Sequence, residues 1–156
     1  MKRKITLITT VILIVFVTPI FAADELDDAL INNIAKRENV SAETVKKAID
    51  DGCDSGITKL MNECVNYYYA GADIQLNRAY QSLMKKITSK ISKLRLKKMQ
   101  KAWIVQRDAT CNTESESWEG GSGYHVAFTT CLQTQTEERT EKLNEYLNCK
   151  SACPWD

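Results

Sequence analysis

A short acidic and aromatic segment carries the side chains best suited to contact another protein. Residues 112–124 combine three carboxylates and two aromatic rings with glycines and small polar residues. The candidate binding residues are Glu114, Glu116, Trp118, Glu119 and Tyr124. Large aromatic side chains often anchor protein interfaces, and a negative field speeds the encounter with a basic partner. The alternative is a solvated loop whose glycines only let the chain turn.

A second stretch has the opposite charge. From Lys85 to Lys101 there are eight basic residues and no acidic one. These are Lys85, Lys86, Lys90, Lys93, Arg95, Lys97, Lys98 and Lys101. On a helix they make a strongly positive surface. Most such runs are solvated faces; as a functional surface this one would bind an anionic polymer or lipid surface of the cell envelope.

Catalysis and metal binding have little support in the residue pattern. His125 is the single histidine, and no serine or cysteine near it in sequence belongs to a recognisable nucleophile motif. The cysteines contain no CxxC pair, which argues against a zinc site. The sequence therefore predicts a binding protein that is not an enzyme and that needs neither a cofactor nor a metal.

The first residues resemble a secretory signal peptide. Lys2, Arg3 and Lys4 precede an apolar run of 17 residues that ends at Phe21, and small residues follow at positions 22 and 23. We expect cleavage near Ala22 and a mature protein that is periplasmic or secreted. Removal of the three leading basic residues leaves 18 of the 21 basic residues and all 20 acidic ones. The mature protein then has a net charge near −2. Export also argues against nucleic acid as a partner.

Six cysteines follow the predicted leader: Cys53, Cys64, Cys111, Cys131, Cys149 and Cys153. An even number behind a signal peptide predicts a disulfide framework. Fifteen pairings are open, and spacing alone does not choose among them. We favour the sequentially nearest scheme, in which each cysteine bonds the next one along the chain.

Helical periodicity extends over nearly all of the remaining chain. A first helix ends near Asn39, and a second begins after the N-cap residue Ser41 and stops at Gly52. The longest apolar stripe is the strongest signal. Its members are Met61, Val65, Tyr68, Ala72, Leu76, Tyr80, Leu83 and Ile87.

Two further long helices follow a reset of the pattern near Ser89. The first should end near Cys111, and its expected inward residues are Ile91, Leu94, Met99, Trp103 and Ile104. Residues 112–123 then predict a loop, and a last helix should run from Tyr124 to Leu147.

These elements predict an all-α fold. We expect an antiparallel bundle of three long helices, preceded by a short N-terminal helical hairpin and cross-linked by disulfides. The expected divisions are a signal peptide at residues 1–22, the hairpin at 23–52, the main helical domain at 53–148 and a tail at 149–156.

Three segments together resemble a known family. The first holds Cys64, Tyr69, Ala72-Asp73, Leu76-Asn77 and Tyr80; the second Gln100, Ala102-Trp103-Ile104, Arg107-Asp108 and Cys111; the third Gly120-Gly121-Ser122, Cys131-Leu132, Thr136, Arg139 and Leu143. Their order and spacing are similar to the LprI-like lysozyme-inhibitor family (N-terminal domain type), from about Cys53 to Leu143. Two features depart from the family pattern, because Gln106 replaces a frequent aromatic residue and the lipid-anchoring cysteine of some members is missing.

Several residues of these motifs predict a structural network. Tyr69, Asp73 and Asn77 share one helix face, and Trp103 and Arg107 share another. We expect Arg107 to donate to Asp73 or Asp108, with Trp103 as a packing anchor and Arg139 joining from the last helix.

The resemblance implies an exported inhibitor whose partner is lysozyme or another peptidoglycan-degrading enzyme. Lysozymes are usually basic and cleave a sugar chain in a groove between two carboxyl groups. The segment 112–124 would enter that groove. The alternative is an envelope-associated binding module that uses the basic helical surface without inhibiting an enzyme.

Overall fold

The fold is helical throughout the part of the chain that the structure describes. A computed structural model describes residues 27–151 and 153–154, so the predicted signal peptide lies outside the described residues. Within them the α-helices are α1 (Asp28–Glu38), α2 (Ala42–Gly52), α3 (Thr58–Lys86), α4 (Lys90–Ser115) and α5 (Tyr124–Asn148), with a short 3-10 helix, η1 (Glu116–Trp118). The all-α prediction is confirmed.

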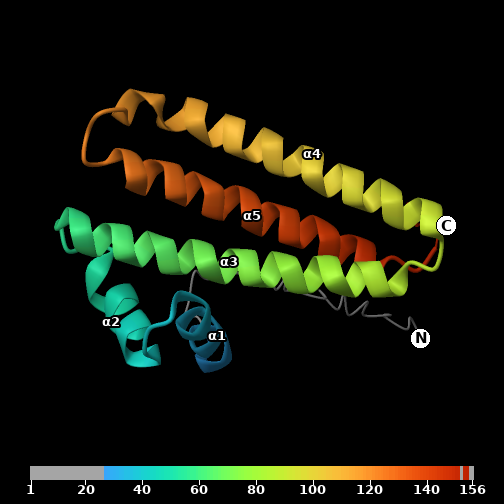
Figure 1. Cartoon of the computed structure of the whole chain (residues 1–156), viewed down its shortest axis with the longest axis horizontal. Helices are drawn as coiled ribbons and strands as arrows, with labels where there is room; N and C mark the ends of the chain where they lie inside the picture. Colours follow the sequence, from blue (N-terminus) through green and yellow to red (C-terminus); the bar gives the residue numbers. More distant parts are fainter. Residues whose placement is uncertain (1–26, 152, 155–156) are drawn as a thin grey trace, which may run out of the picture.

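The three long helices lie side by side, and α5 packs closely on both of the others (Figure 1). Its most extensive packing is against α3, whereas α4 packs mainly on α5. The helices α1 and α2 pack on α3. Since α4 forms one edge of the molecule in Figure 1, its outer side is left uncovered by the other helices.

Two apolar clusters hold these elements together. One joins the N-terminal helices to α3 and is formed by Leu30, Ile31, Ile34, Ala35, Val45 and Ala70. The other lies where all three long helices meet, and it is formed by Leu76, Ala79, Leu83, Ile87, Leu96 and Leu143. In the second cluster Leu83, Leu96 and Leu143, one from each long helix, are fully buried.

Side-chain caps set several helix starts. The Asp27 carboxylate accepts a hydrogen bond from the Leu30 amide at 2.7 Å, and the Ser41 hydroxyl accepts one from the Thr44 amide at 3.0 Å. These bonds satisfy amides that have no partner within the first turn of a helix. Asn39 has a φ of 56°, a left-handed conformation that asparagine tolerates, and it ends α1.

The contact between α2 and α3 depends on a glycine. A Cβ atom at Gly52 would lie 2.8 Å from the Leu60 carbonyl oxygen, so a larger residue would push the two helices apart. The neighbouring Cys53 is bonded to Cys64 on α3, with a Cα–Cα distance of 5.4 Å. Gly52 and this disulfide therefore fix the second helix on the third.

Three disulfides cross-link the chain, as the even cysteine count predicts. Besides the first, Cys111 bonds Cys131 and Cys149 bonds Cys153. This is the sequentially nearest of the fifteen pairings. Among the described residues no helix has the length and apolar character to cross a membrane.

The expected inward face of α4 is partly wrong. Ile91 and Leu94 are 64% and 58% exposed, and Ile104 is 39% exposed, whereas Leu96 is fully buried. Met99 and Trp103 do pack against the second cluster. The inward face is therefore centred on Leu96 and continues through Trp103, Arg107 and Cys111. Apolar side chains also occupy the opposite, exposed face of this helix, so their spacing predicted the wrong inward face for part of it.

Two leucines that are two positions apart on α4 test this assignment. Leu96→Ala should lower the free energy of unfolding by about 2–5 kcal/mol, because it leaves a cavity in a packed core. Leu94→Ala should change it by less than about 0.5 kcal/mol, because Leu94 faces outward. Urea unfolding followed by circular dichroism measures both, and equal losses would contradict the assigned face.

Candidate functional site

The acidic aromatic segment lies at one end of the long helices, where α4 leads through η1 into α5. The expectation of a loop over residues 112–123 is wrong for its first half. Residues 112–115 continue α4, and residues 116–118 form η1. Only residues 119–123 form a turn between helices. Sequence composition pointed to a loop because these residues are small and polar, but the helix continues because the Cys111 disulfide and the Ser115 side chain support its last turn.

Residues 112–124 are called the tip from here on. Backbone hydrogen bonds close its turn, with the Glu119 amide donating to the Glu116 carbonyl at 3.0 Å and the Gly121 amide donating to the Trp118 carbonyl at 2.9 Å. Gly120 has a φ of 77°, which glycine adopts without strain. The turn therefore has a defined conformation.

Trp118 lies across this turn. Its side chain is 56% exposed. A Cβ atom at Gly123 would lie 2.8 Å from Cε3 of the Trp118 ring, so the ring packs directly on the glycine backbone. The absence of a side chain at Gly123 thus provides the surface on which the indole rests, with one face still open to solvent.

The candidate binding residues divide into two groups. Glu116, Trp118 and Glu119 are exposed, and no hydrogen bond or ion pair occupies their side chains within the described residues. Tyr124 is half-buried, stacks on Phe128 with ring centroids 5.9 Å apart, and donates a hydrogen bond to Asn112 at 3.2 Å. Glu114 is exposed, but its carboxylate lies 3.2 Å from the Cys131 sulfur. Tyr124 therefore supports the tip, Glu114 lies beside its disulfide, and the other three are exposed on it.

The base of the tip is clamped. The disulfide between Cys111 and Cys131 joins α4 to α5 with a Cα–Cα distance of 5.5 Å. One helical turn further along, the buried Ser115 hydroxyl donates to the Cys111 carbonyl at 2.7 Å. On the α5 side, His125 and Asn66 form a hydrogen bond of 2.9 Å that ties the base to α3.

An arginine stack joins the three long helices beneath the tip. The Arg107 guanidinium lies 5.7 Å from the centroid of the Tyr69 ring and 5.1 Å from that of Trp103. It donates two hydrogen bonds to Asp108, at 2.9 and 2.7 Å, and one to the Thr136 hydroxyl at 3.2 Å. The Arg107 side chain is only 9% exposed. These contacts reach α3, α4 and α5 from one buried cation.

Arg139 occupies the neighbouring position. Its guanidinium lies 5.6 Å from the Trp103 ring, and its Nε donates to Gln100 at 3.0 Å. Partial burial lowers the pKa of Arg139 from its usual value. Burial raises the pKa of Tyr69, and the Arg107 charge beside it opposes that rise. The stack therefore holds its charges by cation–π contact and hydrogen bonding.

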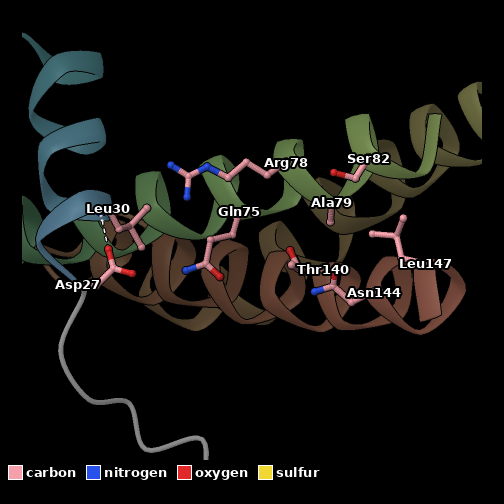
Figure 2. A pocket seen from close by; sticks show the side chains of 9 residues that line it. All are labelled: Asp27, Leu30, Gln75, Arg78, Ala79, Ser82, Thr140, Asn144 and Leu147. Carbon is pink, nitrogen blue, oxygen red and sulfur yellow. Dashed lines mark hydrogen bonds between the residues drawn. The ribbon is translucent and has the colours of Figure 1, made fainter. Parts of the chain in front are cut away.

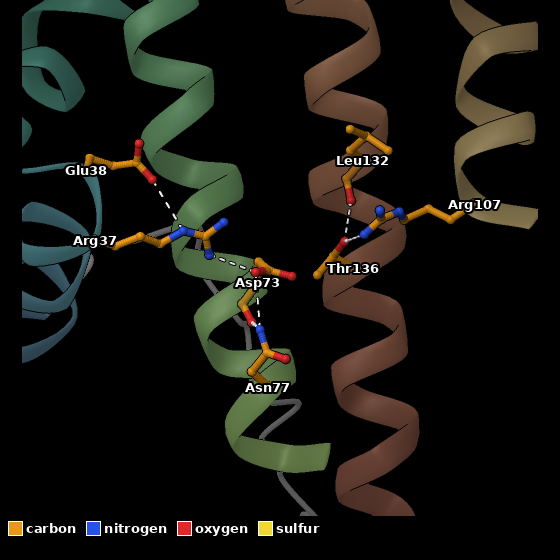
Figure 3. Close-up of polar contacts among 7 residues, drawn as sticks. All are labelled: Arg37, Glu38, Asp73, Asn77, Arg107, Leu132 and Thr136. Carbon is orange, nitrogen blue, oxygen red and sulfur yellow. Dashed lines mark hydrogen bonds and ion pairs between the residues drawn. The ribbon is translucent and has the colours of Figure 1, made fainter. Parts of the chain in front are cut away.

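Asp73 and Asn77 do not belong to this stack. Of the two expected partners of Arg107, the structure pairs it with Asp108 and not with Asp73. Figure 3 shows Asp73 on α3 between Arg37 and Asn77, whereas Arg107 bonds Thr136 on α5. Arg37 donates to the Asp73 carboxylate at 2.7 Å, and the Asn77 amide donates to it at 3.2 Å. These residues attach α1 to α3.

The comparison with protein-family models bears directly on these residues. The family model described as Lysozyme inhibitor LprI matches residues 51–143, which include the whole tip and the arginine stack. The chain belongs to the LprI lysozyme-inhibitor family. Members of this family are inhibitors and not enzymes, and the family is typically extracytoplasmic.

A curated relative is similar to this chain over part of its length. An uncharacterized protein of Rhizobium meliloti (strain 1021) is 28% identical over 108 residues, covering 61% of this chain and 78% of the relative. No solved structure matches the chain at a significant level. Arg37 precedes the residues that match the LprI model, so the ion pair with Asp73 joins a helix outside the match to one inside it.

The chain also has a shallow groove at a distance from the tip. Its volume is about 380 Å³, and α1, α3 and α5 line it. Figure 2 shows Gln75 and Arg78 on one side and Thr140 and Asn144 on the other. Gln75 and Arg78 are exposed, so the groove is an open surface feature. Within the described residues no group of three or more His, Cys, Asp or Glu side chains could hold a metal ion.

Sequence reasoning missed some residues that hold the site. No sequence spacing identifies Arg37 as part of an ion pair, because its partner Asp73 lies 36 positions away. The sequence predicts Gly123 only as a turn residue, because its role as the surface under Trp118 depends on a contact that no short-range pattern shows. Ser115 was detectable in principle, since serine in a last helical turn often bonds back to a preceding carbonyl.

Arg107→Lys tests the arginine stack. Lysine keeps the charge but loses the paired hydrogen bonds to Asp108. It also loses the contact of a planar guanidinium with the Tyr69 and Trp103 rings. We expect the free energy of unfolding to fall by about 2–3 kcal/mol. Arg78→Lys, at an exposed position without a partner in the described residues, should cost less than about 0.5 kcal/mol. Similar costs for the two variants in urea unfolding would contradict the role of the stack.

Removing the clamp tests the rigidity of the tip. The variant Cys111→Ala/Cys131→Ala should lose about 3 kcal/mol of stability and show faster amide exchange over residues 112–124. The matched variant Cys149→Ala/Cys153→Ala opens a much smaller loop and should lose about 2 kcal/mol without affecting exchange in the tip. Hydrogen exchange with mass spectrometry measures this, and a tip that exchanges equally slowly without its disulfide would show that the clamp is unnecessary.

Proposed function

We propose that this protein is exported and blocks a lysozyme-type enzyme by inserting its tip into the enzyme's substrate groove. The observation that carries the proposal is the group formed by Glu116, Trp118 and Glu119. These side chains project from a tip that is clamped at its base, and no side-chain partner in the described residues occupies them. Membership in a family of lysozyme inhibitors supports this class of partner.

Rigidity is what an inhibitor of a groove requires. Ordering a flexible loop on binding costs free energy that reduces affinity, and a preformed tip avoids that cost. Trp118 offers a large ring that needs little further ordering, because it already packs on Gly123. Such an aromatic residue is suited to be the central anchor of an interface.

The carboxylates suit the same partner. Glu116 and Glu119 flank Trp118, so the tip presents negative charge around an apolar centre. A basic enzyme would be steered towards it, and the association rate should depend on salt. Lysozymes cleave their substrate with two carboxyl groups in the groove. The glutamates would therefore contact the basic rim, with the indole in the groove itself.

The placement of the glutamates is unfavourable for the helix that carries them. Negative side chains are destabilising near a helix C-terminus, where the macrodipole is already negative. Glu114 lies in the last turn of α4, and Glu116 is its C-cap residue, while no basic residue lies in that turn. Helix stability does not account for these residues, whereas recognition of a basic partner does.

Trp118→Ala tests the proposal most simply. We expect the inhibition constant against a basic animal lysozyme to rise by at least 30-fold, as for a hot-spot residue. Lysis of Gram-positive cell walls, followed by turbidity, measures it. Ile57→Ala is the matched control, because Ile57 is 57% exposed and lies outside the tip. Unchanged inhibition by the tryptophan variant would exclude the tip as the inhibitory element.

The two glutamates have a separate expected effect. Glu116→Gln/Glu119→Gln should slow association with the lysozyme at low salt and leave the dissociation rate nearly unchanged. Stopped-flow measurements at about 0.05 and 0.5 M salt separate these rates. Asp50→Gln/Asp51→Gln on α2 removes the same charge elsewhere and should change the association rate much less. Equal effects of the two pairs would show that only net charge matters.

A further inference from the structure

The outer face of α4 carries an unusual mixture of side chains. Ile91, Leu94 and Val105 are 64%, 58% and 70% exposed. With Lys98 and Lys101 they follow one another along the helix at intervals of three, four, three and four residues, from Ile91 to Val105. All five residues therefore share one stripe. This stripe lies opposite the buried Leu96. It is called the outer stripe below.

The outer stripe is not explained by packing within the molecule. Among the described residues, the large exposed apolar side chains are Val40, Ile57, Ile91, Leu94, Ile104, Val105 and Trp118. Most of these belong to α4, and α4 lies at the edge of the molecule with its outer side uncovered (Figure 1). Grouped exposed apolar residues indicate an interaction surface more often than scattered ones do.

The charges around the stripe are unpaired. Lys90, Lys98 and Lys101 are exposed, and none has a hydrogen-bond or ion-pair partner in the described residues. Lys86 differs, because it donates to the Leu147 and Cys149 carbonyls at the end of α5. These three free lysines all lie on α4.

Helix stability does not explain these lysines either. Lys90 and Lys93 lie in the first turn of α4, where the macrodipole disfavours positive charge, and no acidic residue lies in that turn. The macrodipole therefore does not favour the lysines at the start of this surface.

We propose that the outer stripe of α4, together with its flanking lysines, docks the protein on an anionic phospholipid membrane. Lysines would contact the headgroup phosphates, and their aliphatic stems would lie along the surface. Leu94, Val105 and Ile91 would enter the boundary between headgroups and acyl chains. A second copy of the chain is a poor occupant, because two such faces carry the same charge.

Apolar content distinguishes a membrane from a soluble polyanion. A polyanion would satisfy the lysines but would leave Ile91, Leu94 and Val105 without an apolar partner. A lipid surface offers negative charge and apolar contact within the same few ångströms. The stripe and the tip share no residue, so variants of the stripe leave the side chains of the tip unchanged, and this proposal does not rest on the proposed inhibition.

Flotation with lipid vesicles tests the proposal. Wild-type protein purified after export should bind vesicles of phosphatidylcholine with 30% phosphatidylglycerol and should not bind phosphatidylcholine alone, and about 0.5 M salt should weaken binding. Lys98→Gln/Lys101→Gln should weaken binding about 25-fold, at roughly fivefold per charge. Leu94→Gln/Val105→Gln should weaken it about tenfold at both salt concentrations.

Matched controls address the common alternatives. Lys46→Gln/Lys47→Gln removes the same charge from α2, and Ile57→Gln removes an exposed apolar residue from the start of α3; both should bind as the wild type does. All variants share one N-terminus, so any contribution of the leading residues cancels. Lysozyme inhibition should be unchanged in the α4 variants, which separates this test from that of the tip.

Three results would overturn the proposal. One is a wild-type protein that does not float with the anionic vesicles. Another is a Leu94→Gln/Val105→Gln variant that binds as tightly as the wild type while polyglutamate competes for the lysines, which would identify an acidic polymer or protein as the partner. The third is equal weakening by the α2 control, which would show that binding follows net charge alone.

Discussion

The helix α4 is attached to the rest of the molecule along one side, and the Arg107 stack and the Cys111 disulfide make most of that attachment specific. Arg107 contacts Tyr69 on α3, Trp103 and Asp108 on its own helix, and Thr136 on α5. A buried guanidinium needs all of its donors directed at acceptors or rings, so it tolerates few relative positions of the three helices. The tip and the outer stripe both depend on that position, because both belong to α4 or continue from it.

Charge is distributed unevenly along this one helix. Its N-terminal half carries free lysines, its C-terminal end leads to glutamates, and both arrangements oppose the helix macrodipole. The whole chain is nearly neutral, with 21 basic and 20 acidic residues. Net charge therefore conceals two surfaces of opposite sign. The two surfaces share no residue.

Much of the fold was predictable because its signals are local. Apolar spacing along residues 61–87, the Ser41 cap and the even cysteine count each act within a few residues or on composition. The inward face of α4 was not predictable in the same way, since apolar side chains occupy both of its faces and only packing shows that Leu96, and not Leu94, is buried. Two contacts have no signal in local residue spacing. One is the ion pair between Arg37 and Asp73, and the other is the packing of Trp118 on Gly123.

The central claim is that the tip is the surface that meets the enzyme. Hydrogen exchange of the protein alone and in complex with a lysozyme tests it most directly, because every backbone amide reports its own protection. The account predicts slower exchange over residues 114–124 on complex formation, with little change along α1 and the groove beside Gln75 and Asn144. Protection confined to that groove, with an unchanged tip, would contradict the account.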